Sequence, residues 1–342
     1  MGDDFYLAKL LDGLGPINVV EGGSGYFSKP DTHLDPRLFL PTNSLRGEVR
    51  QWLLSTLYDY WQTRWNAPES WSTVWIAGSG ICYQWAADRS NGDLDILIGI
   101  HWSRFYQSNP ETQGLSETEL CDVINNDLRT NLWSKTGSTL IGTQGEPNGS
   151  DVGEFSGIFE VTFYCNPRST DIRDIHPYAA YDLSHNRWTV TPPVLPDDTE
   201  SIYPKAYWDT VHAERAQATG LVERYNHLAN SLAVQHPTTP GWSNTMSQMG
   251  LVVDQANHLF DDIHLGRKNA FGPDGQGYGD FYNFRWQAHK RFGTIAALSS
   301  LAQARKGAKD AMERATYGVP LKNAEQALTD AALWNTPYRK KA

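Results

Sequence analysis

Two aspartates with one residue between them, Asp93 and Asp95, form the pattern in this sequence that is best suited to chemistry. They open the segment 93–100, whose apolar residues predict a β-strand. Residues two apart in a strand lie on the same face, where neighbouring carboxylates repel one another unless a cation neutralises them. Such oxygens suit Mg²⁺ or Mn²⁺, beside water and substrate phosphates. A pair of these ions about 3.5–4 Å apart could activate a hydroxyl and stabilise a leaving pyrophosphate.

A solvated strand end with two exposed acids is the alternative interpretation of the pair. The residues that follow it, 96–98, are all apolar and predict a strand that is buried on both faces. Acids at the start of a buried strand favour a functional role for the pair over the interpretation as a solvated strand end.

A glycine–serine turn precedes the acids. Gly78 and Ser79 follow a predicted strand over 73–77, and we expect a short helix over 81–87. Glycine allows the backbone to approach a ligand closely, and a helix N-terminus offers free N–H groups to phosphate. The hydroxyl of Ser79 adds a further donor. The turn therefore predicts a phosphate-binding element beside the aspartate pair.

The order of strand, Gly-Ser turn, helix, Asp-x-Asp and strand over 73–100 resembles the nucleotidyltransferase fold. Polymerase β, the poly(A) and CCA-adding enzymes, aminoglycoside nucleotidyltransferases and the cyclic-oligonucleotide synthases share that fold. The resemblance implies that Gly78 and Ser79 hold NTP phosphates and that Asp93 and Asp95 ligate the metal. The sequence departs from the family pattern at 81–85, which lacks the usual Gly or Thr, and at Gly92, where Ser is frequent.

The resemblance also implies a third acid on a later strand. We assign it to Glu160, which is the only acid inside the predicted strand 155–165. Its apolar neighbours indicate partial burial, and a buried acid is costly without a metal or a basic partner. The alternative is an outward-facing acid on a half-exposed sheet. The rival acids, all in predicted loops, are Asp151, Glu154 and Asp171.

Related two-domain enzymes bind the triphosphate with basic residues from a helical domain. In this chain the resemblance implies that role for Arg285 and Lys290, with Arg267, Lys268 and Arg291 as the other candidates. Each of them could equally belong to a solvated helix face. Tyr282 or Trp286 could stack on a base or lie in the core. His101 and His176 are interpreted as structural residues, because two-metal nucleotidyl transfer needs no histidine base.

The elements around these residues predict an α/β (α+β) fold with a mixed sheet flanked by helices and a following C-terminal helical domain. A helix should begin near Asn43 or Ser44, either of which could cap it, and another at Ser116, where Glu119 completes a capping box. A strand is expected at 187–191, and the proline-rich run 192–198 is the best linker. Helices are predicted over 209–234, 243–265 and 282–306. The glycine-rich loop 271–280 is either a lid or a plain surface loop.

We divide the chain accordingly into four parts. An irregular N-terminal lead-in spans 1–42, and the catalytic domain spans 43–195. A helical domain follows over 196–320, and 321–342 form a short helix and a basic tail.

The composition narrows the classes of partner. The formal net charge is −10, and no dense Lys/Arg block occurs before the last residues, 339–341. A small or locally bound acceptor is therefore favoured over long nucleic acid. Three cysteines without zinc spacing indicate a reducing, cytoplasmic compartment. Neither a signal peptide nor a membrane-spanning segment is expected, so no membrane is among the expected partners.

The sequence thus predicts transfer of a nucleoside monophosphate from an NTP to a hydroxyl, with Mg²⁺ or Mn²⁺ as cofactor. The acceptor could be a second nucleotide, an RNA or tRNA end, a protein or a small molecule. One alternative is a metal-dependent glycosyltransferase, in which Asp-x-Asp binds a nucleotide-sugar. Another is an inactive nucleotide sensor or scaffold.

Overall fold

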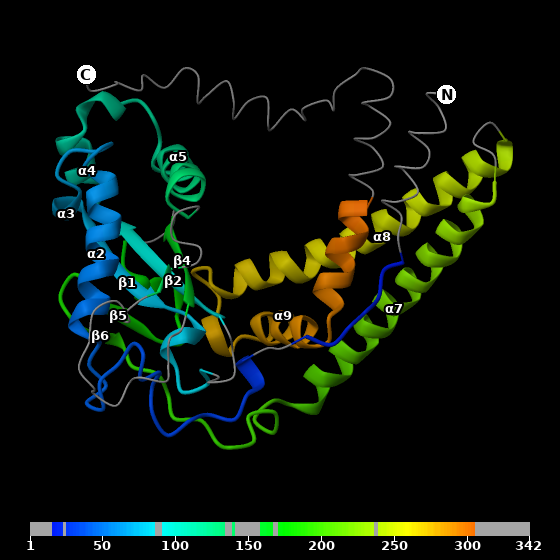
Figure 1. The fold of residues 1–342 in the computed structure, drawn as a ribbon, viewed down its shortest axis with the longest axis horizontal. Helices are drawn as coiled ribbons and strands as arrows, with labels where there is room; N and C mark the ends of the chain where they lie inside the picture. The colour runs from blue at the N-terminus through cyan, green and yellow to red at the C-terminus, as the bar shows by residue number, and fades with distance from the viewer. Residues whose placement is uncertain are drawn as a thin grey trace. The chain divides into compact units, whose positions relative to one another are not determined.

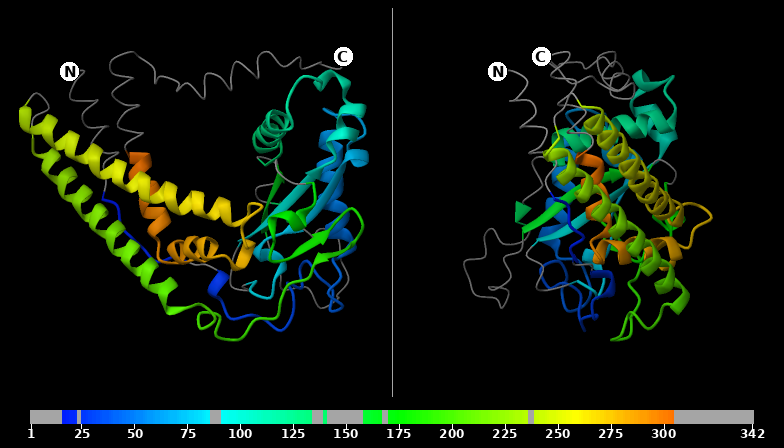
Figure 2. Two further views of the ribbon diagram at one scale, coloured as in Figure 1. Left: turned by 180° about the vertical axis from the view of Figure 1, so that it is seen from behind. Right: turned by 90° about the vertical axis from the view of Figure 1, so that its right-hand side faces the viewer.

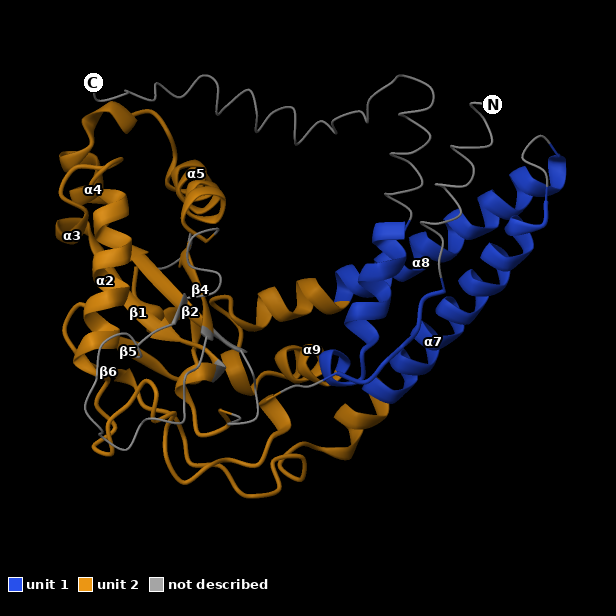
Figure 3. Ribbon diagram, viewed as in Figure 1, with its two compact units in different colours: residues 1–22, 211–262, 289–342 blue, residues 23–210, 263–288 orange. Residues whose placement is uncertain are grey.

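The computed structural model describes residues 16–22, 25–85, 91–133, 139–140, 158–166, 170–235 and 239–304. They form two compact units, coloured separately in Figure 3. Unit 1 takes in the described parts of 1–22, 211–262 and 289–342, and unit 2 those of 23–210 and 263–288.

Unit 2 contains a six-stranded mixed sheet in the order β3-β4-β2-β1-β5-β6 (Figure 1). Only the pair β2–β4 is parallel, and the other ladders are antiparallel. The expected α/β class with a mixed sheet flanked by helices is therefore confirmed. The strands are β1 (Ser72–Ala77), β2 (Asn91–Ile100), β3 (Thr139–Leu140), β4 (Ile158–Cys165), β5 (Ala180–Asp182) and β6 (Arg187–Val190).

One face of the sheet carries the main core of unit 2. In β2, Leu94, Ile96 and Ile98 are fully buried, whereas Asp95 is exposed and Leu97 only half-buried. The expectation that this strand is buried on both faces therefore holds only in part, because Leu97 packs on the second face whereas Asp95 is exposed there. The degree of burial follows the period of two that is typical of a strand.

Two helices cover that core face. Helix α2 (Gly47–Trp61) contributes a stripe of buried residues at helical spacing, and α5 (Glu117–Asp127) contributes a shorter one. Each apolar side chain that is fully removed from water stabilises the fold by about 1.5–3 kcal/mol. The shared cluster includes Val49, Leu53, Leu57 and Trp61 from α2 and Leu120, Cys121 and Ile124 from α5.

The predicted starts of these helices have different outcomes. Ser116 accepts a bond from the Glu119 amide at 3.3 Å, and Glu119 accepts one from the Ser116 amide at 2.8 Å. That capping box is confirmed. The prediction that Asn43 or Ser44 caps α2 is wrong, because the helix begins at Gly47 after Arg46 without a side-chain cap. Asn43 instead has a left-handed backbone, with φ of 60°.

The segment before α2 belongs in part to the core. Leu34, Leu38 and Phe39 are buried in the same cluster as the strands. Asp35 and Arg37 are also buried, and the Arg37 guanidinium donates to both carboxylate oxygens of Asp35. The residues 34–39 are thus packed structure within the predicted lead-in.

The remaining elements of unit 2 are short. They are the helices α3 (Pro68–Trp71) and α4 (Trp102–Ser108), the π-helical η4 (Leu128–Trp133), and the 3₁₀ segments η1 (Gly25–Phe27), η2 (Ser79–Ile81), η3 (Pro110–Thr112), η5 (Ile172–Ile175) and η6 (Gly277–Gly279). The helix expected over 81–87 is absent from its described part, where 82–85 follow η2 without helical structure. The described residues contain no helix that is long and apolar enough to cross a bilayer.

Three helices match those predicted after the sheet: α7 (Lys205–Ala233), α8 (Pro240–Ala270) and α9 (Phe281–Arg291). Within unit 1, the long helices α7 and α8 run side by side (Figures 1 and 2). The third prediction, one helix over 282–306, is wrong in one respect, because a turn at Phe292 and Gly293 interrupts it. Gly293 has φ of 72°, and a Cβ there would lie 1.8 Å from the Val20 carbonyl oxygen. Only glycine fits that position.

Candidate metal and nucleotide site

Asp95 lies in the middle of a row that crosses three strands. Its Cα partner in β1 is Ala77, and its Cα partner in β4 is Thr162. The Asp95 side chain is exposed, and the Thr162 hydroxyl donates a hydrogen bond of 3.1 Å to its Oδ1. The carboxylate is therefore presented on the face opposite the main core and is oriented there by a neighbouring strand.

The glycine of the predicted phosphate turn touches this carboxylate. Gly78 directly follows β1, has φ of 89°, and approaches Asp95 so closely that a Cβ would lie 2.9 Å from its Oδ2. The turn and the acid, which were singled out separately in the sequence, are thus brought together. The expected helix N-terminus is absent, since the chain continues into a 3₁₀ segment of three residues, η2. Only backbone is described at Ser79, so its predicted hydroxyl contact lies outside the described side chains.

The other two acid positions form the next row of the sheet. Asp93 and Glu160 are Cα partners in the parallel ladder between β2 and β4. Residues in register on neighbouring strands share a face, and 93 and 95 share one by alternation. The three predicted acid positions are therefore neighbours in the register of one corner of the sheet. The side chain of Asp93 lies outside those that the structure describes.

The burial expected for Glu160 is wrong. Its neighbours Phe159 and Val161 are buried in the core, but Glu160 itself points to the opposite, exposed side. The apolar flanks indicated burial because they face the other way in the alternating strand. What favours Glu160 as the third acid is its register with Asp93.

The same face is covered over β1 and β5. Trp75, Ala77 and Ala180 pack there with Ile172, and the partly buried residues against this smaller cluster are Leu97, Ile175 and Val190. On β4, by contrast, Glu160 and Tyr164 are exposed. This face is thus packed over β1 and β5, up to the Cα partner of Asp95, and exposed along β4.

The donor atoms fit a hard divalent cation. The three positions offer carboxylate oxygens, which suit Mg²⁺ or Mn²⁺ better than a metal that prefers sulfur or imidazole. Among the side chains that the structure describes, no group of three His, Cys, Asp or Glu is close enough to hold a metal. The side chain of Asp93 is not among them, so the set of Asp93, Asp95 and Glu160 is supported by strand register and donor chemistry.

The two predicted cations differ in their surroundings. Arg285 belongs to unit 2, as the acids do, and its side chain is buried. Lys290 is exposed and belongs to unit 1. In unit 2, the Arg267 guanidinium lies 4.9 Å from the centre of the Trp286 ring, which indicates a packing role for both residues. Phosphate binding by Arg285 and Lys290 stays a prediction.

Tyr278 holds the loop 271–280 against other residues of unit 2. The Tyr278 ring lies 3.8 Å from the centre of the Tyr178 ring, and its hydroxyl donates to Gln84 at 3.1 Å. The Tyr278 amide donates to the His176 carbonyl at 3.3 Å. These contacts favour the surface-loop interpretation of this segment over the lid.

The histidines singled out in the sequence have structural surroundings. His101 Nε2 lies 3.2 Å from the Thr73 hydroxyl, and burial together with nearby Arg104 lowers the pKa of His101. His176 has a left-handed backbone, with φ of 48°, at the end of η5. Neither observation calls for a role in proton transfer.

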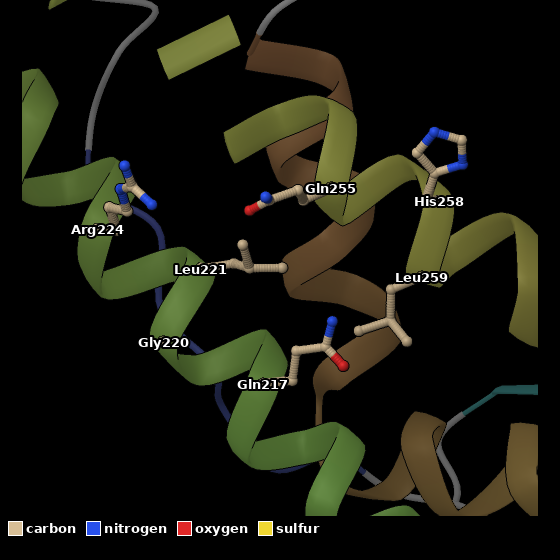
Figure 4. A pocket seen from close by; sticks show the side chains of 7 residues that line it. All are labelled: Gln217, Gly220, Leu221, Arg224, Gln255, His258 and Leu259. Carbon is tan, nitrogen blue, oxygen red and sulfur yellow. The ribbon is translucent and has the colours of Figure 1, made fainter. Parts of the chain in front are cut away.

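A groove of about 590 Å³ lies between α7 and α8 in unit 1 (Figure 4). Leu221 and Leu259 are its buried residues, while the polar side chains at its edge are exposed. Arg224 supplies its one permanent charge among the lining residues, which are Gln217, Gly220, Leu221, Arg224, Gln255, His258 and Leu259. No buried polar group marks this groove as a second site.

Sequence reasoning missed Thr162. Its spacing of two from Glu160 on a predicted strand was the available signal, because alternation places both residues on one face. Its bond to Asp95 depends on the pairing of β2 with β4. Comparison with protein-family models, curated proteins and solved structures gave no match.

Proposed function

We propose that this chain is a metal-dependent nucleotidyltransferase, which transfers a nucleoside monophosphate from an NTP to a hydroxyl acceptor and releases pyrophosphate. The observation that carries the proposal is the close approach of Gly78 to Asp95. It joins a glycine turn that suits phosphate to an acid that suits a metal. The register of Asp93 with Glu160 adds two acids to the same corner.

Each residue has a defined task in this proposal. Asp93, Asp95 and Glu160 would hold Mg²⁺ or Mn²⁺, which would activate the acceptor hydroxyl and neutralise the leaving pyrophosphate. The acceptor oxygen would form a bond to the α-phosphorus as the bond to the β-phosphate oxygen breaks. The close approach of the Gly78 backbone to Asp95 would place the turn beside the metal-bound phosphates, and the Ser79 hydroxyl would donate to the terminal phosphates.

The two other functions have less support. A glycosyltransferase with Asp-x-Asp is expected to open with a nucleotide-binding βαβ unit. The described residues that precede β1 contain α2, α3 and η1, but no such unit. An inactive sensor would be signalled by loss of an acid, whereas Asp93 and Asp95 are both present.

The test is incubation of the purified protein with each of the four labelled NTPs and Mg²⁺ or Mn²⁺, with and without bulk tRNA. The key variant is the double substitution Asp93→Asn/Asp95→Asn. Asp59→Asn is the matched control, because Asp59 is an exposed acid on α2 in the same unit. Circular dichroism checks that all variants fold.

We expect pyrophosphate release that needs the metal, is lost in the double variant and is unchanged in the control. The labelled product then identifies the acceptor as a nucleotide, an RNA end, a protein or a small molecule. Metal-dependent NTP binding without release would indicate a sensor or a missing acceptor. Release that persists in the double variant would exclude the mechanism.

A further inference from the structure

We infer that Thr162 is a positioning residue, which fixes the Asp95 carboxylate for binding of a divalent cation. The inference rests on the proposed function, because it concerns the same metal site. It assigns a task to a residue that neither the Asp-x-Asp pattern nor the Gly-Ser turn includes. Its basis is the hydrogen bond from the Thr162 hydroxyl to Asp95 Oδ1, at 3.1 Å.

The two oxygens of Asp95 face different neighbours. Oδ1 accepts the bond from Thr162 on β4, while Oδ2 lies on the side of Gly78, which follows β1. The bond from Thr162 thus restrains one carboxylate oxygen, while the other lies beside the Gly78 backbone. An exposed aspartate without such a bond would exchange between rotamers, and it would have to be ordered when the metal binds.

Thr162 is itself well placed to hold an acid. It is half-buried in β4, between Val161 and Phe163, which are both fully buried. Its Cα partner in the β2–β4 ladder is Asp95 itself, so the hydroxyl and the carboxylate are direct neighbours across the strands. A threonine is branched at Cβ, which restricts its χ1 angle, so the hydroxyl direction is stable.

A hydrogen bond of this kind affects how a carboxylate binds a metal, although its donor does not contact the metal itself. Hydrogen bonds to metal-bound carboxylates orient the ligand, and loss of one weakens metal affinity or activity by about 10–100-fold. The alternative is a bond that only contributes to stability of the sheet. That alternative predicts a change in folding without a change in metal affinity.

The variants separate these possibilities. Thr162→Val keeps the branched shape and removes the hydroxyl, whereas Thr162→Ser keeps the hydroxyl. Thr162→Ala serves as a second hydroxyl-free variant should the valine form fail to fold. Thr73→Val is the matched control, because Thr73 lies in the same sheet on β1, the other neighbour of β2, and its hydroxyl contacts His101.

The first readout is Mn²⁺ binding to the full-length protein without nucleotide, measured by electron paramagnetic resonance and calorimetry. We expect affinity about 10-fold weaker in Thr162→Val or Thr162→Ala, and unchanged in Thr162→Ser and Thr73→Val. The second readout is NTP turnover over a Mg²⁺ series. The hydroxyl-free variants should need more Mg²⁺ for half-maximal rate and recover part of kcat at high Mg²⁺.

Unchanged Mn²⁺ affinity in the hydroxyl-free variants overturns the role of Thr162, as does an equal loss in Thr73→Val. A wild-type protein that does not bind Mn²⁺ overturns both this inference and the proposed function. A wild-type protein that binds Mn²⁺ through Asp95 but transfers no nucleotide overturns only the proposed function.

Discussion

Gly78 and Asp95 are so close that the glycine cannot carry a side chain, since a Cβ at position 78 would lie 2.9 Å from Asp95 Oδ2. Real Cβ atoms essentially never come that near to an oxygen. The backbone at Gly78 is also left-handed, with φ of 89°. This position is thus restricted to glycine both by its own backbone and by the acid it faces.

Gly78→Ala should therefore damage the site more than the fold. The new Cβ must displace the carboxylate of Asp95, and a misplacement of about 1 Å at a reacting centre can cost about 100-fold in rate. Turnover should fall by that order, and Mn²⁺ affinity should fall with it. Both are measured on protein that is shown to be folded by circular dichroism.

Gly114→Ala is the matched control for that substitution. Gly114 also has a left-handed backbone, with φ of 109°, but a Cβ there meets nothing within 4 Å. Both variants should lose about 1–3 kcal/mol of stability from backbone strain, while only Gly78→Ala loses activity. Equal activity in the two variants would show that contact with Asp95 is irrelevant to function.

Glu160→Gln should reduce turnover at least about 100-fold while leaving the fold intact, because the amide removes one negative oxygen ligand from the proposed metal site. The exposed position of Glu160 means that its charge is not needed for packing. Steady-state kinetics with Mg²⁺ measure the effect.

The rival acid Asp171 provides the comparison for Glu160. Its carboxylate accepts hydrogen bonds from Arg173, which lower the pKa of Asp171. An acid engaged in that way is a poor choice for a metal ligand, and Asp171→Asn should leave turnover within about twofold, since an exposed ion pair contributes little. A reversed order of effects would move the third acid to Asp171.

The sequence predicts those features of this site that depend on residues close together in the chain, and it does not predict those that depend on residues far apart in it. The strands around Asp93 and Asp95 and the capping box at Ser116 are encoded by local patterns, and they were predicted from them. The pairing of Asp93 with Glu160 joins residues far apart in the chain, so no local pattern contains it. For the same reason the apolar residue at 97 suggested a strand buried on both faces, although its neighbours in space leave that face partly open.

The segment 34–39 shows that amino-acid composition is limited in the same way as a predictor of structure. Glycine, proline and aspartate are frequent around it, and they predicted an irregular lead-in. The buried pair of Asp35 and Arg37 cannot be recognised from the composition, because each charge is tolerated inside only through the other. The break at Gly293 likewise follows from a close approach to Val20 and not from helix propensity.

That buried pair should be important for stability. Asp35 accepts from the Arg37 amide at 2.9 Å and from its guanidinium, and the guanidinium also lies 4.5 Å from the centre of the Phe159 ring. Removal of one partner leaves an uncompensated buried charge, so Asp35→Asn or Arg37→Met should cost about 3–5 kcal/mol. Urea denaturation measures the loss.

The double variant Asp35→Asn/Arg37→Met tests the cause. Because it removes both charges, it should be less destabilised than the sum of the two single variants. Additive losses would mean that the two side chains contribute independently, through packing alone.

Cys121 should make stability fall at alkaline pH. Its thiol is buried and donates to the Cys165 carbonyl oxygen at 3.3 Å, and burial raises the pKa of Cys121 to about 12. In the unfolded chain a cysteine ionises near about pH 8.5. Above that pH the unfolded state releases a proton that the folded state keeps, so the contribution of Cys121 is complete below about pH 8.5 and is lost as pH rises toward 12.

The measurement compares wild type with Cys121→Ala in reducing buffer, by urea denaturation at pH 7.5, 9 and 10. The variant should be less stable at pH 7.5, because a buried side chain is truncated. The difference in free energy of unfolding should then narrow as pH rises, since only the wild type loses the thiol contribution. A difference that stays constant over this range would show that Cys121 is not protected from ionisation in the folded protein.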